Sequence, residues 1–214
     1  MEILAVFLYF CFFSLLAWRN FRIALICFVI LLPSYLIRFK LGPFPSTILE
    51  LTFGSIFFVW LIKHSRRDLK KIWRLSKHHK VFFVCFALFF LASVVSIFIS
   101  DMPIPSLGEW RAYFLEPMIF FLILMGRLPT PLMSPLGKGG MTATDLVWGL
   151  AFSTLSISIY AIAQKITGWG IATPEFAADS TRRVTAFFSS PNSVGLYLGP
   201  VLMLMVTVIA NEVK

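Results

Sequence analysis

The sequence predicts an all-α protein, a bundle of about seven helices that span a membrane. Of its 214 residues, 58% are hydrophobic and only 14% are charged, and the mean hydropathy is +0.86. Apolar runs long enough to cross lipid recur between charged segments. A hydrocarbon core about 30 Å thick needs roughly 20 apolar residues per helix, and backbone polar groups inside it must be satisfied within the protein. No soluble domain fits in the remaining sequence.

The apolar runs between charges give the expected spans in chain order. They are Ile3–Trp18, Ile23–Ile37, Pro45–Ile62, Val81–Ile99, Ala112–Gly126, Leu146–Gln164 and Ser193–Ala210. The second and fifth runs are short, but arginines at their ends can snorkel to the interface. The first run is expected to be a retained helix and not a signal peptide. Glu2 stands where a signal peptide has basic residues, and Arg19 follows the apolar stretch.

Charge sets the expected orientation of these helices. Residues 63–80 carry eight of the nineteen Lys and Arg residues, so the positive-inside rule places this loop in the cytoplasm. Alternation from there puts 13 Lys and Arg inside and six outside, and it places residues 165–192 outside. The same basic loop is expected to attract anionic lipid headgroups. Nucleic acid is not an expected partner, because the basic segments flank runs of lipid length.

The chain divides into three expected parts. Residues 1–126 form an N-terminal group of spanning helices that contains the basic cytoplasmic loop 63–80. Residues 127–145 are rich in proline, glycine and serine, which predicts a flexible cytoplasmic linker. Residues 146–214 form a helix pair with an outward-facing Arg and Pro-Asn segment between its members.

No metal or cofactor is expected. The three cysteines lie inside apolar runs without paired spacing, and the three histidines lie within the basic loop, where neighbouring positive charges disfavour protonation.

Two acidic residues near the expected membrane boundary are candidates for a polar site. Glu50 lies at the start of the third run, and Glu116 lies about one turn into the fifth. A carboxylate at this depth is costly unless it is paired, and Arg38 and Arg111 are the expected partners. Two interpretations remain: ion pairs that hold helices together, or groups that line an outward-facing cavity for a polar headgroup.

The stretch STRRVTAFFSSPN before the last run contains the strongest candidate site. Pro191 and Asn192 predict a helix start, with the Asn side chain as N-cap. Arg182 and Arg183 precede that start on the outer side, against the positive-inside rule. A guanidinium pair beside a helix N-terminus suits phosphate or pyrophosphate. The alternatives are arginines that snorkel to lipid phosphates or that pair with Asp179.

The pattern RVTAFFSSPNSVGLYL, Arg183 to Leu198, resembles the arginine and Pro-Asn signature of the O-antigen ligase and polymerase family of bacterial membrane proteins. The preceding LAFSTLSISIYAIAQKITGWG is similar to the helix that comes before this signature, which ends in Gln and a glycine-bearing turn. Further upstream, LPSYLIRFKLGPFPSTILELTF and GEWRAYFLEPMIFFLIL resemble N-terminal helices of bacterial relatives.

The resemblance implies a multi-pass enzyme of the bacterial inner (cytoplasmic) membrane that acts in lipopolysaccharide or other polysaccharide biosynthesis for the cell envelope. Such an enzyme transfers a glycan from an undecaprenyl pyrophosphate carrier to an acceptor sugar at the periplasmic face, without a metal ion. Its partners are the lipid-linked donor, an acceptor glycan or lipid, and membrane lipids. Carried onto this sequence, Arg183 is the first candidate for binding the pyrophosphate and Arg182 the second.

This sequence departs from the family in two ways. The family has more spanning helices than seven, and a periplasmic loop after the signature carries a histidine suggested as the base. Here the histidines are all in the expected cytoplasmic loop. The chain is therefore expected to be an N-terminal portion of a longer or split product, or a degenerate member. The alternatives are a transporter or lipid-binding protein with an outward-facing polar cavity, and a purely structural subunit anchored by its arginines.

Overall fold

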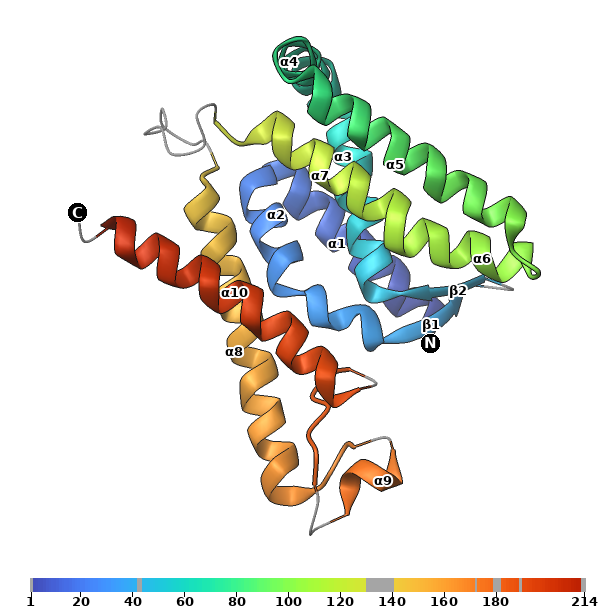
Figure 1. Cartoon of the computed structure of the whole chain (residues 1–214), viewed down its shortest axis with the longest axis vertical. Coiled ribbons are helices and arrows are strands. Elements are labelled where there is room, and N and C mark those ends of the chain that lie inside the picture. Colours follow the sequence, from blue (N-terminus) through green and yellow to red (C-terminus); the bar gives the residue numbers. More distant parts are fainter. Residues whose placement is uncertain are drawn as a thin grey trace. The chain divides into compact units, whose positions relative to one another are not determined.

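The computed structural model describes residues 2–41, 44–129, 141–171, 173–178, 182–188 and 190–212. These residues fall into two compact units. The first unit comprises Met1–Thr52 and Thr142–Lys214, and the second comprises Phe53–Met141. Helices make up most of both units, and two four-residue strands are the only strands among the described residues (Figure 1). The all-α class predicted from the sequence is therefore confirmed.

The described residues of the first unit form five α-helices and three smaller elements, and they include the start of α3. In chain order they are α1 (Glu2–Arg19), α2 (Phe21–Ile30), the 3-10 helix η1 (Leu32–Leu36), β1 (Arg38–Leu41), β2 (Phe44–Thr47), α8 (Ala143–Thr167), α9 (Pro174–Ala177) and α10 (Pro191–Glu212).

Helices are the only regular elements among the described residues of the second unit. Its elements are most of α3 (Ile48–Lys63), α4 (Ser65–His78), α5 (Lys80–Ile99), α6 (Pro103–Trp110), the π-helix η2 (Arg111–Leu115) and α7 (Glu116–Arg127).

Three helices are long and apolar enough to cross a membrane: Lys80–Ile99, Ala143–Thr167 and Pro191–Ala210. A fourth span results if α3 and α4 are counted together, although the chain bends by 88° between them. The helices α1 and α2 are apolar but shorter. By length and composition the chain is thus a helical membrane protein with three to four candidate spans among its described residues, fewer than the seven predicted.

The second and third predicted spans are less regular than their sequences suggested. Helix α2 ends at Ile30, and a short 3-10 helix with Pro33 in its first turn follows. A two-stranded antiparallel ribbon then pairs Arg38 with Thr47, so helix α3 begins only at Ile48. Pro33 lacks the N–H group that a continuing α-helix needs, which explains the break in the second run.

Contacts that α8 makes with two other helices hold the first unit together. Helix α8 contacts α2 and α10. Gly149 lies against α2, since a Cβ there would come within 3.3 Å of Val29 Cγ1. A hydrogen bond of 2.7 Å between Ser153 Oγ and Tyr197 OH joins α8 to α10.

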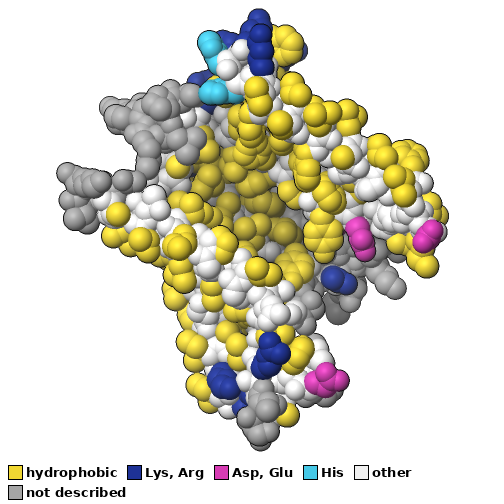
Figure 2. Space-filling model, viewed as in Figure 1, with side chains coloured by type: hydrophobic (Ala, Val, Ile, Leu, Met, Phe, Trp, Pro, Cys, Tyr) yellow, Lys and Arg dark blue, Asp and Glu magenta, His cyan; other side chains and the backbone are white. Residues whose placement is uncertain are grey.

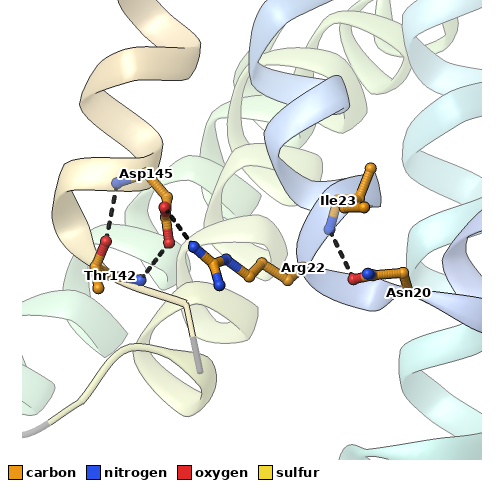
Figure 3. Close-up of polar contacts among 5 residues, drawn as sticks. All are labelled: Asn20, Arg22, Ile23, Thr142 and Asp145. Carbon is orange, nitrogen blue, oxygen red and sulfur yellow. Dashed lines mark hydrogen bonds and ion pairs between the residues drawn. The ribbon is translucent and has the colours of Figure 1, made fainter. Parts of the chain in front are cut away.

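Polar contacts fix the start of α8 beside the start of α2 (Figure 3). The Thr142 hydroxyl accepts a hydrogen bond from the Asp145 backbone N–H, and the Asp145 carboxylate accepts one from the Thr142 N–H, which forms a capping box. The same carboxylate lies 2.8 Å from Arg22 Nη2. Asn20 caps α2 by accepting a hydrogen bond from the Ile23 N–H. One carboxylate therefore both begins α8 and ties it to α2.

The second unit is built on aromatic contacts between α5 and the chain from α6 to α7. Phe82 and Phe86 contact Phe121, whereas Phe90, farther along α5, contacts Trp110. These pairings run in opposite directions along the two segments, so α5 and α7 lie antiparallel. Their ring centroids are 5.8–6.1 Å apart, a range typical of favourable aromatic pairs.

The basic segment 63–80, predicted to be a loop, is mostly the helix α4. Its Asp68 side chain is 2% exposed and accepts a hydrogen bond of 3.0 Å from Trp60 Nε1. Arg127 Nε at the end of α7 lies 3.5 Å from the same carboxylate oxygen. Gly126 allows this approach, because a Cβ there would meet Asp68 Cβ at 2.6 Å. Buried ionic contacts to α7 therefore order a segment whose charge density had suggested a loop.

The position of His64 between α3 and α4 predicts a pH dependence of stability. Burial, and then the positive charges of Arg127, Lys63 and Arg67, lower the pKa of His64 from 6.5 to about 4. The unfolded chain therefore binds a proton at this residue below pH 6.5, while the folded chain does not until about pH 4. Stability is expected to fall as the pH is lowered through this window.

Thermal unfolding of the full chain in detergent at pH 7.5, 5.5 and 4.5 measures this effect. His64→Gln is expected to lose less stability on acidification than the wild type does. His78→Gln, at an exposed position of α4, is the matched control and should follow the wild type. Identical pH profiles for the wild type and His64→Gln would contradict the assignment.

Candidate functional site

The candidate site lies in the segment that connects α8 to α10. Helix α8 ends at Thr167, and Gly168 follows it with a φ of 71°, the left-handed conformation that commonly terminates helices and that glycine adopts without strain. Gly170 also has a positive φ of 79°, and a Cβ there would lie 2.2 Å from the Tyr160 hydroxyl oxygen. Both glycines are thus required for the sharp reversal that returns the chain towards α8.

Gln164, in the last turn of α8, binds the returning chain by four hydrogen bonds. Its Oε1 accepts from the backbone N–H groups of Thr185 (3.1 Å) and Ala186 (2.7 Å). Its Nε2 donates to the carbonyls of Gly170 (3.0 Å) and Ala186 (3.2 Å). The Gln164 side chain is fully buried. A single amide therefore fixes the path of residues 182–188, which we call the arginine segment.

Apolar contacts complete the attachment of the arginine segment. Tyr160 stacks on Phe187 with centroids 4.6 Å apart, and Phe188 contacts Tyr197 of α10. Ala186 is buried in a cluster with Ile157, Ala161 and Val194. Its φ of 48° is unusual for a residue with a side chain, which shows that the surrounding contacts impose this conformation.

The Arg182 side chain caps helix α8. Its Nη1 donates to the carbonyls of Lys165 (2.9 Å) and Ile166 (3.2 Å), and its Nε donates to the Ala177 carbonyl at 3.4 Å. Lys165 Nζ in turn donates to the Arg182 carbonyl at 2.8 Å. A cation at the C-terminal end of a helix also interacts favourably with the helix dipole. This guanidinium is thus committed to the scaffold.

The Arg183 side chain does not cap α8 and makes different contacts. It is exposed, its guanidinium lies over the Phe176 ring at 5.6 Å, and its Nη2 donates to Asn192 Oδ1 at 3.2 Å. Its backbone N–H donates to the Phe176 carbonyl at 2.9 Å. A guanidinium carries five N–H donors, and the Asn192 bond, which is its only side-chain hydrogen bond among the described residues, uses one of them. Arg183 thus retains donors for a ligand.

Lys and Arg side chains are visible at the surface around α9 (Figure 2). Asp179, the acid considered above as a partner for these arginines, lies outside the described residues.

The N-cap role expected for Asn192 is wrong. Helix α10 begins at Pro191, and Asn192 lies in its first turn, where its side-chain oxygen accepts the Arg183 hydrogen bond. Proline suits the first helical position because its φ is fixed and its missing N–H would have no partner inside the helix. The helix therefore starts two residues earlier than expected, and Asn192 is available to position Arg183.

The Glu50 side chain takes part in the N-terminal cap of α3. Its Oε2 accepts from the Ser46 hydroxyl (2.8 Å) and from the Thr47 N–H (3.3 Å), and its own N–H donates to Thr47 Oγ1 (3.1 Å). This is the reciprocal pattern of a capping box at the start of α3. Arg38, its expected partner, lies on β1 opposite Thr47. The spacing T-x-x-E at positions 47–50 was the sequence signal for this role.

Glu116 pairs with Arg111, as the sequence suggested. Arg111 Nε lies 3.5 Å from Glu116 Oε1, and the Glu116 N–H donates to the Arg111 carbonyl five residues earlier. This longer hydrogen bond belongs to the π-helix η2 and brings residues five apart onto one face. Pro117 cannot donate to the carbonyl of Tyr113, which accounts for a π-turn at this position. The ion pair is local to one segment of the second unit.

Among the described residues, no three His, Cys, Asp or Glu side chains are grouped as a metal ion would require. Comparisons with protein-family models, with curated proteins and with solved structures gave no significant match.

Sequence reasoning missed the roles of Gln164 and Phe176 at the candidate site. For Gln164 a signal existed, since it is a lone amide in an apolar helical turn. Nothing in the sequence pointed to Phe176.

Proposed function

We propose that this chain is an O-antigen ligase or polymerase-like membrane protein that binds the pyrophosphate of an undecaprenyl-linked glycan donor through Arg183. The observation that carries the proposal is the different use of two adjacent arginines. Arg182 caps α8, whereas Arg183 is exposed beside the first turn of α10 and is positioned by Phe176 and Asn192. Arg183 is therefore the primary pyrophosphate ligand, and Arg182 acts by holding the segment in place.

The chemistry of this position suits a phosphate ligand. The N-terminus of α10 offers a positive dipole end, and the guanidinium fork matches two phosphate oxygens at once. Gln164 and Phe187 hold the arginine segment against α8, so little ordering of the backbone is needed when a ligand binds. Preorganised donors of this kind stabilise charge more effectively than solvent does.

In the proposed reaction, an acceptor hydroxyl attacks the anomeric carbon of the donor glycan. The bond between that carbon and the pyrophosphate oxygen breaks, and undecaprenyl pyrophosphate leaves with the electron pair. Arg183 stabilises the negative charge that develops on this leaving group. We assign no residue of this chain as the base that takes the proton from the acceptor hydroxyl.

The topology belongs to the same proposal: seven spans in the bacterial inner membrane, with residues 165–192 on the periplasmic side. Two contacts of the first unit agree with the alternation of sides within this topology. Arg22 pairs with Asp145, and both are assigned to the cytoplasmic side. Tyr35 donates to the Phe187 carbonyl at 3.4 Å, where both residues are assigned to the periplasmic end. Each contact thus joins two segments that the alternation of spans assigns to the same side of the membrane.

The transporter alternative has less support. It required Glu50 and Glu116 to line an outward-facing cavity, but Glu50 closes a capping box and Glu116 pairs with Arg111 within one helical segment. Both carboxylates thus have structural roles that need no transported substrate.

Substitution of Arg183 is expected to weaken binding of undecaprenyl pyrophosphate to the full chain in nanodiscs. Arg183→Ala should weaken it about tenfold or more, because a hydrogen bond to a charged group contributes roughly 1.5–3 kcal/mol. Arg183→Lys should show a smaller but clear loss, because an ammonium group cannot form the bidentate contact. Titration with the lipid, and in parallel with undecaprenyl monophosphate as the weaker ligand, provides the measurement.

Two variants serve as controls. Arg38→Ala removes one positive charge from an exposed position of β1, away from the arginine segment, and should leave binding almost unchanged. Arg182→Ala should lower the thermal stability, because it removes the cap of α8. Arg183→Ala should leave the thermal stability close to that of the wild type. Wild-type affinity for undecaprenyl pyrophosphate in both Arg183 variants would overturn the proposal.

A further inference from the structure

We propose that helix α4 is an interfacial helix that binds the headgroups of anionic lipids along its basic face. The helix carries three stripes of side chains at helical spacing. The buried stripe, including Asp68 and Ile72, packs against α7. The other two stripes are exposed. The apolar one consists of Leu69 and Trp73, and the basic one consists of Arg66, Lys70, Arg74 and Lys77.

The apolar stripe indicates that α4 does not face water alone. Trp73 is 66% exposed and Leu69 is 51% exposed, one turn apart on the same face. Tryptophan beside basic residues is typical of helices that lie in the membrane interface, where the ring sits at headgroup depth. Lys77 Nζ lies 5.7 Å from the Trp73 ring, so the apolar and basic stripes are adjacent.

The neighbouring helices place α4 at a membrane surface. The chain bends by 88° where α3 ends and α4 begins, and α5, a candidate span, starts two residues after α4 ends. A helix in this position runs roughly along the membrane plane if α3 is inserted. Figure 2 shows Lys and Arg side chains gathered over α4, with hydrophobic side chains covering α5 next to them.

Structural contacts leave the basic stripe available. Lys71 is used inside the unit, where its Nζ donates to the carbonyls of Gly126 (3.2 Å) and Leu128 at the end of α7. Asp68, the one acidic residue of α4, is buried against Arg127 and Trp60 and does not neutralise the exposed stripe. The outer face of α4 is thus positive next to an apolar stripe, which complements an anionic lipid surface.

Quenching by brominated lipids tests this assignment on the full chain. The protein is reconstituted in nanodiscs of 70% phosphatidylcholine and 30% phosphatidylglycerol, with the brominated chains on one lipid or the other at equal mole fraction. The Trp73 signal is the difference between wild-type protein and Trp73→Phe. We expect Trp73 to be quenched by both lipids, and about twofold or more strongly by brominated phosphatidylglycerol.

Two double variants separate the effect of this helix from net charge. Lys70→Gln with Arg74→Gln should bring the quenching ratio of the two lipids close to one. Arg19→Gln with Lys80→Gln removes the same charge from outside α4 and should keep the wild-type ratio. Each double variant is measured with and without Trp73→Phe. If neither brominated lipid quenches Trp73, α4 faces water or a protein partner, and the proposal is overturned. An unchanged ratio in the α4 double variant would also overturn the proposal.

Discussion

Replacing Gln164 with methionine is expected to lower the free energy of unfolding by about 3 kcal/mol or more. Methionine has a similar length and helix propensity, so the change removes the amide with little effect on α8 itself. The backbone N–H groups of Thr185 and Ala186 and the Gly170 carbonyl lose their partner in a buried environment. Each unsatisfied buried group of this kind costs about 1–3 kcal/mol.

The same substitution should release the arginine segment and thereby weaken the proposed binding of pyrophosphate by Arg183. Unfolding of the full chain in detergent micelles measures the stability, and limited proteolysis between α8 and α10 reports the release. Ala163→Met, at the exposed neighbouring position of α8, is the matched control and should change neither quantity. A Gln164→Met protein with wild-type stability and wild-type protease resistance would show that the amide does not hold the segment.

The helices of this protein could be predicted because their signal is local. Each of the seven apolar runs falls mainly on a helix of the structure, since a long apolar run has few other ways to satisfy its backbone. Breaks within the runs depend on single residues. Pro33 ended α2 early, and Pro117 accompanies a π-turn that pairs Arg111 with Glu116. Both prolines are present in the sequence, but the 3-10 helix at Pro33 and the π-turn before Pro117 were not predicted.

The candidate site was only half predictable. Arg182 and Arg183 are alike in sequence, and their different roles depend on the chain reversal at Gly168 and Gly170. Gln164 could not have been assigned from a motif, because its partners are backbone groups up to 22 residues away. The capping box of Thr47 and Glu50, by contrast, could have been predicted from the T-x-x-E spacing. Glu50 was interpreted instead as part of a candidate polar site.

The helix α4 shows how charge can hide regular structure. Eight basic residues in 18 suggested a loop, yet Leu69, Ile72, Trp73 and Leu75 recur at helical spacing. What could not be seen was the role of Asp68, whose partners Trp60 and Arg127 lie on other helices.

Asp68→Leu is expected to destabilise the second unit by about 3–5 kcal/mol, because it removes one partner of a buried ionic contact. Trp60 Nε1 loses its acceptor, and the half-buried Arg127 loses the carboxylate that faces it. Burial raises the pKa of Asp68, whereas the nearby Arg127 charge opposes this shift. Asp68→Asn also removes the charge, but its amide oxygen can still accept the Trp60 hydrogen bond, so this variant is expected to lose less stability than Asp68→Leu.

The double variant Asp68→Leu with Arg127→Met decides whether the cost comes from the charge left behind or from lost packing. If the remaining guanidinium causes most of the loss, replacing both partners with apolar side chains should restore most of the wild-type stability, because no buried charge then lacks a counter-charge. Equilibrium unfolding in detergent of the wild type, Asp68→Leu, Arg127→Met and the double variant yields the coupling energy between Asp68 and Arg127. A double variant no more stable than Asp68→Leu would place the cost in the packing of α4 against Gly126, where a Cβ would meet Asp68 Cβ at 2.6 Å.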